Sequence, residues 1–199
     1  MAVGACGSSP SVPTASATAV ATPSPSGVVS PSIAATASPP LETSFTPGPS
    51  AATVPIDPGL LDLLPSTVAG IPVTEVPNPS GIDDPTLVST VERLVEAVVI
   101  DPASGDFAYA SIIVLRSGVY DAAFFTSWRD SFDVGACSQA GGVTGHSQAT
   151  IGGRMTYIGK CSGGVLTYHV RLAAEDAIVS VSSLGPSHLG QKLLTGLRP

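Results

Sequence analysis

Three residues in the chain have the types and order that nucleophilic catalysis needs: a serine, an acid and a histidine. Ser147 lies in the segment GHSQA at 145–149, and Asp176 and His188 follow it along the chain. A serine hydroxyl becomes a nucleophile when a histidine takes its proton and an acid orients that histidine. Whether these residues can act in this way depends on the elements that surround Ser147.

The segment at 145–149 resembles the nucleophile elbow of α/β-hydrolases, G-x-S-x-G, with Ala149 in place of the last glycine. The resemblance implies a triad of Ser147, Asp176 and His188. The elbow requires an apolar strand before the serine and a helix after it. Here a glycine-rich stretch precedes Ser147, and the pattern of 149–151 continues as a strand. We therefore expect an exposed hydroxyl and no enzyme, with a small serine hydrolase using Ser147 as the catalytic alternative.

The sequence gives no pattern for a cofactor or a metal centre. The glycine-rich loop at 140–145 is followed by neither a lysine nor a helix start, so a phosphate site is not expected. His146, His169 and His188 lie far apart, without the spacing of metal ligands. We expect no cofactor and no metal.

Polar and apolar side chains alternate along the later strands that the pattern predicts. Antiparallel strands of this kind usually have one polar face. If neighbouring strands pair, one face carries a set that could bind a glycan or a cell-wall fragment. That set is Gln148, Thr156, Thr167, His169, Arg171, Ser180 and Ser182, with His146 as a further candidate. An ordinary solvated face is the alternative, and a slip of one residue would invert the whole assignment.

The first of the three cysteines, Cys6, follows the residues Val3-Gly4-Ala5. This tetrapeptide resembles the lipobox of bacterial lipoproteins, in which the cysteine is lipidated and the preceding peptide is removed. A signal peptide also needs a basic n-region and an apolar h-region, which five residues cannot supply. We expect 1–6 to be the remnant of a signal peptide and lipobox; either the true start lies upstream of Met1, or the resemblance is accidental. The resemblance implies a lipid anchor on Cys6 and an extracytoplasmic location at the cell envelope.

The other two cysteines, Cys137 and Cys161, remain after Cys6 is assigned to lipid. In an exported protein such a pair is usually a disulfide. Zinc is the rival interpretation, but there is no C-x-x-C pair and no nearby cluster of ligands. We expect a disulfide between them.

Composition divides the chain into a linker and a domain. Residues 7–58 are rich in Pro, Ser, Thr and Ala and nearly free of charge, so they bury too little area to offset the entropy of ordering. We expect a disordered linker there, inert or glycosylated, and a single domain at 59–199. The net charge of −7 argues against a nucleic-acid partner.

The elements expected in 59–199 predict an α+β domain. The order is β-α-β-α-β-β-β-β-α, a mostly antiparallel sheet of five to six strands with helices on one face. The strands are 71–76, 107–116, 146–151, 154–160, 165–173 and 178–183. The helices are a segment capped by Asp84 with an apolar stripe over 87–98, a second at 119–132, and a last one from Pro186.

The second predicted helix carries Tyr120, Phe124 and Trp128 on one stripe, with Phe125 and Phe132 beside it. We interpret this stripe as core packing, with a ligand-stacking face as the alternative. The simplest function that fits these expectations is the presentation of a non-catalytic, monomeric domain on a lipid-anchored tether. Its partners would be the membrane and an envelope protein or glycan.

Overall fold

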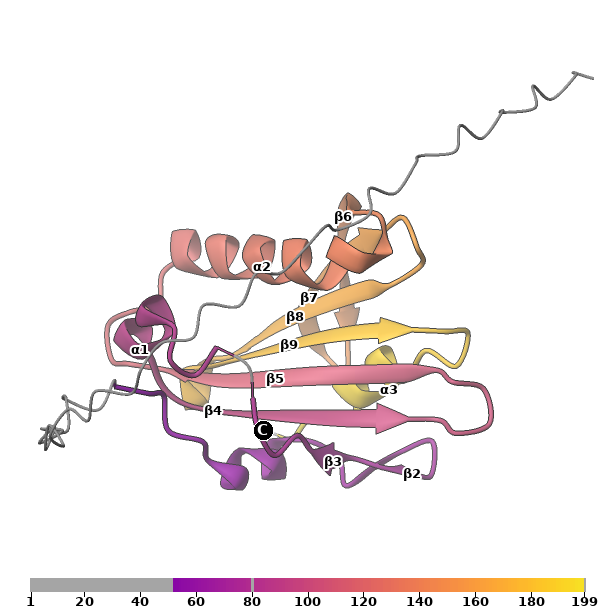
Figure 1. Cartoon of the computed structure of the whole chain (residues 1–199), viewed down its shortest axis with the longest axis horizontal. Helices are drawn as coiled ribbons and strands as arrows, with labels where there is room; N and C mark the ends of the chain where they lie inside the picture. Colours follow the sequence, from indigo (N-terminus) through magenta and orange to yellow (C-terminus); the bar gives the residue numbers. More distant parts are fainter. Residues whose placement is uncertain (1–51, 80, 199) are drawn as a thin grey trace, which may run out of the picture. The chain divides into compact units, whose positions relative to one another are not determined.

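The computed structural model describes residues 52–79 and 81–198. The predicted lipidation site Cys6 and linker residues 7–51 lie outside the described residues. The described chain forms a seven-stranded sheet in which every pairing is antiparallel (Figure 1). In spatial order the strands are β3 (Thr74–Glu75), β4 (Val91–Ile100), β5 (Phe107–Leu115), β9 (Ala177–Leu184), β8 (Leu166–Leu172), β7 (Arg154–Cys161) and β6 (Val143–Ile151). The α+β class and the antiparallel sheet are confirmed.

Short elements and helices complete the fold. The helices are α1 (Pro85–Thr90), α2 (Ala122–Cys137) and α3 (Leu189–Thr195). The short elements are the 3-10 turns η1 (Pro58–Leu63), η2 (Ser138–Ala140) and η3 (Ala173–Glu175), and a two-stranded ribbon of β1 (Thr67–Val68) and β2 (Ile71–Pro72). In the part of the chain that is described, no helix has the length and apolarity that crossing a membrane would require.

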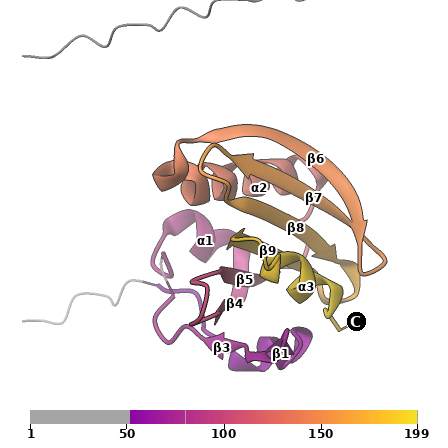
Figure 2. The ribbon, with the colours of Figure 1, turned by 90° about the vertical axis from the view of Figure 1, so that its right-hand side faces the viewer.

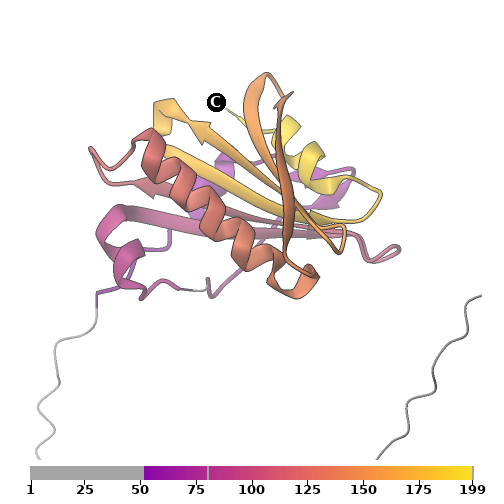
Figure 3. The same cartoon turned by 90° about the horizontal axis from the view of Figure 1, so that it is seen from above.

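Helices α2 and α3 lie on opposite faces of the sheet, as Figure 3 shows. Leu189 and Leu193 of α3 share a buried cluster with Val179 of β9. Phe125 of α2 shares a different cluster with Ile178 of the same strand. Successive residues of a strand point to opposite faces, so the two helices cover different sides. The sheet is therefore covered on both faces, where the sequence pattern predicted helices on only one.

The predicted helix over 87–98 is wrong beyond its first turn and a half. Asp84 caps α1 as expected, with Oδ1 accepting from the backbone N–H groups of Thr86 at 2.7 Å and Leu87 at 3.1 Å. The chain then becomes β4 at Val91 and pairs along β5. This strand is rich in β-branched residues and is buried on both faces, so the alternation that identifies a strand is lost.

The segment before residue 59 already belongs to the folded body. Val54 is buried, and its N–H donates to the Ile82 carbonyl at 2.7 Å. Asp57, predicted as the last part of the linker, pairs with Arg93 at 2.7 Å. Leu60 and Leu64 are buried in the core cluster on the α3 side of the sheet. The two edge strands of the seven-stranded sheet are β3 and β6, and β6 is the outermost strand at the edge opposite β3 (Figure 2).

Candidate functional site

The polar residues predicted to face solvent together are largely covered by α2. Thr167, His169 and Ser180 do share one face of the sheet. The prediction of which residues of β8 and β9 point to the same face is therefore confirmed. All three have 0% exposure because α2 packs over them. His169 of β8 is paired with Tyr157 of β7, and Tyr157 is paired with Gln148 of β6. Gln148 is exposed at the edge of the sheet.

Of the remaining members of the predicted polar set, Arg171 and Ser182 share the face of His169 and Ser180, whereas Thr156 does not. Thr156 is fully buried on the other face, because its neighbour Tyr157 faces α2. Arg171 lies over the Tyr120 ring, 3.2 Å from the ring centroid, and reaches Asp176 at 3.5 Å. These residues therefore do not form one continuous ligand surface.

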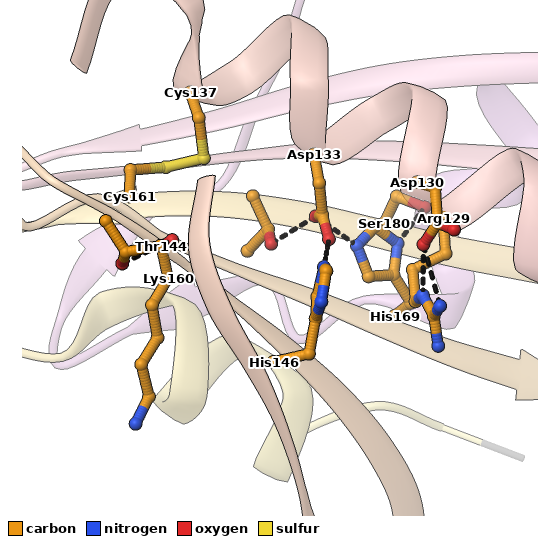
Figure 4. Close-up of polar contacts among 11 residues, drawn as sticks. Arg129, Asp130, Asp133, Cys137, Thr144, His146, Lys160, Cys161, His169 and Ser180 are labelled. Carbon is orange, nitrogen blue, oxygen red and sulfur yellow. Dashed lines mark hydrogen bonds and ion pairs between the residues drawn. A yellow bond between two sulfur atoms is a disulfide. The ribbon is translucent and has the colours of Figure 1, made fainter. Parts of the chain in front are cut away.

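The covered face is organised around Asp133, a residue of α2 whose side chain is 1% exposed (Figure 4). Its Oδ1 lies 2.9 Å from Nε2 of His169 and also accepts a hydrogen bond from the Thr167 hydroxyl. Its Oδ2 lies 2.9 Å from Nε2 of His146 on β6. One buried carboxylate thus connects α2 with two strands of the sheet.

The hydrogen bonds continue from His169 to a tryptophan. Ser180 Oγ lies 3.0 Å from His169 Nδ1, and the indole Nε1 of Trp128 donates to Ser180 Oγ at 3.0 Å. An indole N–H can only donate, so the Ser180 hydroxyl oxygen accepts from Trp128 and also bonds His169 Nδ1. An ionised carboxylate can only accept, so the Nε2–H of His169 donates to Asp133.

Burial and hydrogen bonding act against each other at Asp133. Burial raises the pKa of a carboxyl group, but the hydrogen bonds from His169, Thr167 and His146 outweigh it and lower the pKa of Asp133 below its ordinary value. Asp133 is therefore an ionised buried carboxylate. His146, with a side chain 44% exposed, is the one of its three partners that opens to solvent.

The disulfide helps to hold Asp133 in its position against the sheet. The bonded Sγ atoms of Cys137 and Cys161, predicted as a pair, join the last residue of α2 to the last residue of β7. Asp133 lies one helical turn before Cys137, and Gly159 lies two residues before Cys161 on the same face. The bond therefore fixes the distance between α2 and β7 next to the carboxylate.

A cavity of about 340 Å³ opens beside His146 and is called here the His146 cavity. It is lined by Arg129, His146, Ser147, Gln148 and Tyr157. The Arg129 guanidinium is held by Asp130 at 2.7 Å and lies 5.5 Å from the centroid of the Tyr157 ring. An imidazole oriented by a buried carboxylate, beside an amide and an arginine, can hold a polar ligand.

The same corner brings possible metal ligands together. One ligand atom each from Asp130, Asp133 and His146 lie within 4.8 Å of one another. Both carboxylates are already engaged, Asp130 by Arg129 and Asp133 by its three donors. The three side chains thus already have hydrogen-bond or ion-pair partners.

Ser147 lies in the middle of β6 and is exposed, as predicted for a strand hydroxyl. It and His188 line a cavity of about 280 Å³ on the α3 side. Among the described residues no hydrogen bond joins Ser147 to a histidine, and Asp176 contacts Arg171 instead. The triad order suggested by the sequence is therefore not assembled in space.

Sequence reasoning missed Asp133, which lies just beyond the predicted end of the second helix. The available signal was an acid on the same stripe as Phe125 and Cys137, eight residues after one and four before the other. Comparison with known proteins gives no further guide, because no family model, curated protein or solved structure matches the chain.

Proposed function

We propose that this protein is an exported lipoprotein that presents a non-catalytic α+β domain at the cell envelope. The observation that carries the proposal is the Cys137–Cys161 disulfide. A structural disulfide is typical of exported proteins, and this one accounts for two of the three cysteines. Cys6, preceded by Val3-Gly4-Ala5, is then the cysteine available for a lipid.

In this proposal the membrane is a partner through the lipid on Cys6, and the segment after it is a spacer. A tether of ~50 residues spans on the order of 40 Å as a flexible coil. That length lets the domain reach an envelope protein or a glycan away from the membrane surface. The net charge of −7 favours partners other than nucleic acid.

A polar-ligand module is the second candidate function, and the His146 cavity supports it. Of the polar residues first assigned to the sheet face, Gln148 lines this cavity, while Thr167, His169 and Ser180 support it from below through Asp133. A hydrolase using Ser147 has weaker support, because its hydroxyl lacks a histidine partner within the described chain.

Metabolic labelling tests the lipid anchor. The gene is expressed in its native host with its own upstream DNA, and cells are fed an alkyne-tagged fatty acid. We expect the wild-type protein to carry the label and fractionate with membranes, and Cys6→Ser to lose both properties. Ser8→Ala is the matched control and keeps them. Label that persists in Cys6→Ser, or is absent from the wild type, would contradict the proposal.

A further inference from the structure

A second cavity, here called the α1–α2 cavity, lies between the first two helices, which are neighbours in Figure 1. Its volume is about 370 Å³, within the range of small-molecule sites. Its lining consists of Gly81, Asp84, Thr86, Leu87, Thr90, Phe124, Ser127, Trp128 and Ser131. It shares no lining residue with the His146 cavity, so it is a separate site.

Two aromatic rings form the apolar wall of this cavity. Phe124 and Trp128 lie one turn apart on α2, with ring planes inclined by 19° and centroids 6.5 Å apart. Both side chains are half-buried, so each keeps an open portion. The indole of Trp128 is fixed from beneath by its hydrogen bond to Ser180, at 3.0 Å. The wall is thus preorganised, which reduces the entropy lost when a ligand binds.

Polar groups surround this wall. Asp84 uses Oδ1 to cap α1, and its Oδ2 makes no hydrogen bond within the described residues. The hydroxyls of Ser127 and Ser131 on α2 are likewise without a partner in that part of the chain, whereas Thr90 donates to the Thr86 carbonyl at 2.7 Å. The cavity therefore offers a free carboxylate oxygen and free hydroxyls beside an aromatic surface.

This combination matches a sugar ring. A pyranose has a face of C–H bonds, which packs on the electron-rich face of an aromatic ring, and a rim of hydroxyls that donate and accept hydrogen bonds. The charge selects among sugars. Asp84 is the only charged residue in the lining, no basic residue is present there, and the chain has a net charge of −7. Phosphate, sulfate and carboxylate groups would be repelled.

We propose that the α1–α2 cavity binds a neutral saccharide. Phe124 and Trp128 stack on the sugar ring, Asp84 accepts hydrogen bonds from its hydroxyls, and Ser127 and Ser131 fix its orientation. Phe125 is buried and serves core packing, whereas Phe124 and Trp128 pack against the same core cluster and also line the cavity. The site does not depend on lipid at Cys6, so either proposal can fail alone.

The chain provides its own reporter, because Trp128 is its single tryptophan. The full chain carrying Cys6→Ser, with its disulfide formed, is titrated with D-glucose, D-mannose, D-galactose, L-arabinose and N-acetyl-D-glucosamine. Each is used as the monosaccharide and as a disaccharide. Tryptophan emission and the heat of binding are both recorded. We expect at least one saccharide to change the emission saturably, with a millimolar dissociation constant, and glucose 6-phosphate to bind more weakly than glucose.

Variants assign the binding to this cavity. Asp84→Asn keeps a good helix cap but removes the charge, and it should weaken binding by about tenfold. Ser127→Ala should weaken it by roughly threefold. The matched controls are Asp83→Asn, an exposed acid outside the lining, and Ser147→Ala in the His146 cavity, and both should bind like the parent protein. The proposal is overturned if no saccharide produces a saturable signal, or if Asp84→Asn and Ser127→Ala bind as tightly as the controls.

Discussion

The backbone of Gly159 lies directly against the carboxylate of Asp133. A Cβ atom at residue 159 would stand 2.6 Å from Asp133 Oδ2, closer than any real side chain could remain. The absence of a side chain on β7 is therefore what allows a charged residue of α2 to descend onto the sheet. Once there, the carboxylate takes hydrogen bonds from two strands, and His146 carries the network to the surface.

Replacing Gly159 with alanine should displace Asp133 and destabilise the protein by about 2–4 kcal/mol, through overpacking and broken hydrogen bonds. The measurement is the free energy of unfolding in urea. Gly145→Ala is the matched control, since a Cβ there meets nothing within 4 Å. It should change stability by less than about 0.5 kcal/mol. Equal effects of the two substitutions would contradict the proposed close packing.

Asp133→Asn should lower stability at neutral pH by about 2–4 kcal/mol, because it removes a buried charge that accepts three hydrogen bonds. The exposed Asp130→Asn should cost less than about 1 kcal/mol. Urea unfolding of both variants beside the wild type measures this difference. A result in which Asp130→Asn costs as much as Asp133→Asn would remove the central role given to Asp133.

Acid should also separate wild type from Asp133→Asn. The pKa of Asp133 is lower in the folded chain than in the unfolded one, so its contribution is complete above about pH 4 and is lost as the pH falls through the folded pKa. Asp101 and Asp106 titrate with lowered pKa values in both proteins. Unfolding measured from pH 6 down to about pH 2 should show a shallower loss in the variant. Parallel curves would mean that Asp133 has an ordinary pKa.

Ser180→Ala should leave the Trp128 indole N–H and His169 Nδ1 without a partner in a buried place. The expected cost is about 1–3 kcal/mol, with a shift in tryptophan emission. Ser182→Ala is the matched control, since Ser182 lies on the same strand and face without a side-chain hydrogen bond in the described chain. Urea unfolding and fluorescence compare the two. A neutral Ser180→Ala would show that the hydrogen-bond chain adds no stability.

Replacing Cys137 and Cys161 together with serine should cost about 3 kcal/mol, since the bond closes a loop of 24 residues. Reduction of the wild-type protein should produce a similar loss, and Cys6→Ser should produce none. The midpoint of urea unfolding with and without reductant is sufficient to test this. An unchanged midpoint after complete reduction would contradict the structural role of the bond.

Local patterns predicted the parts of the site that lie on single elements. The alternation along β8 and β9 placed His169 and Ser180 on one face correctly, because period two is a property of one strand. The pattern could not tell that this face is covered. The polar face of an antiparallel sheet is usually solvated. Here that face is buried only because α2 packs over it.

The helix predicted over 87–98 failed for a related physical reason. Leu87, Val91, Leu94 and Val98 recur at three and four residues, which is the spacing of a helical stripe. In β4 the apolar residues instead serve two faces, with Val95 toward α3 and Leu94 toward α2. Pairing with β5 along almost the whole strand outweighs the local pattern.

The sequence by itself determined the class of the domain, the pairing of Cys137 with Cys161, and the parity of the later strands. Each follows from composition, spacing or period along the chain. Tertiary structure decided the site. The partners of Asp133 are 13, 34 and 36 residues away, and the space for its carboxylate depends on a glycine of another element. Contacts of that range exist only after the sheet and α2 have packed together, so no local pattern could encode them.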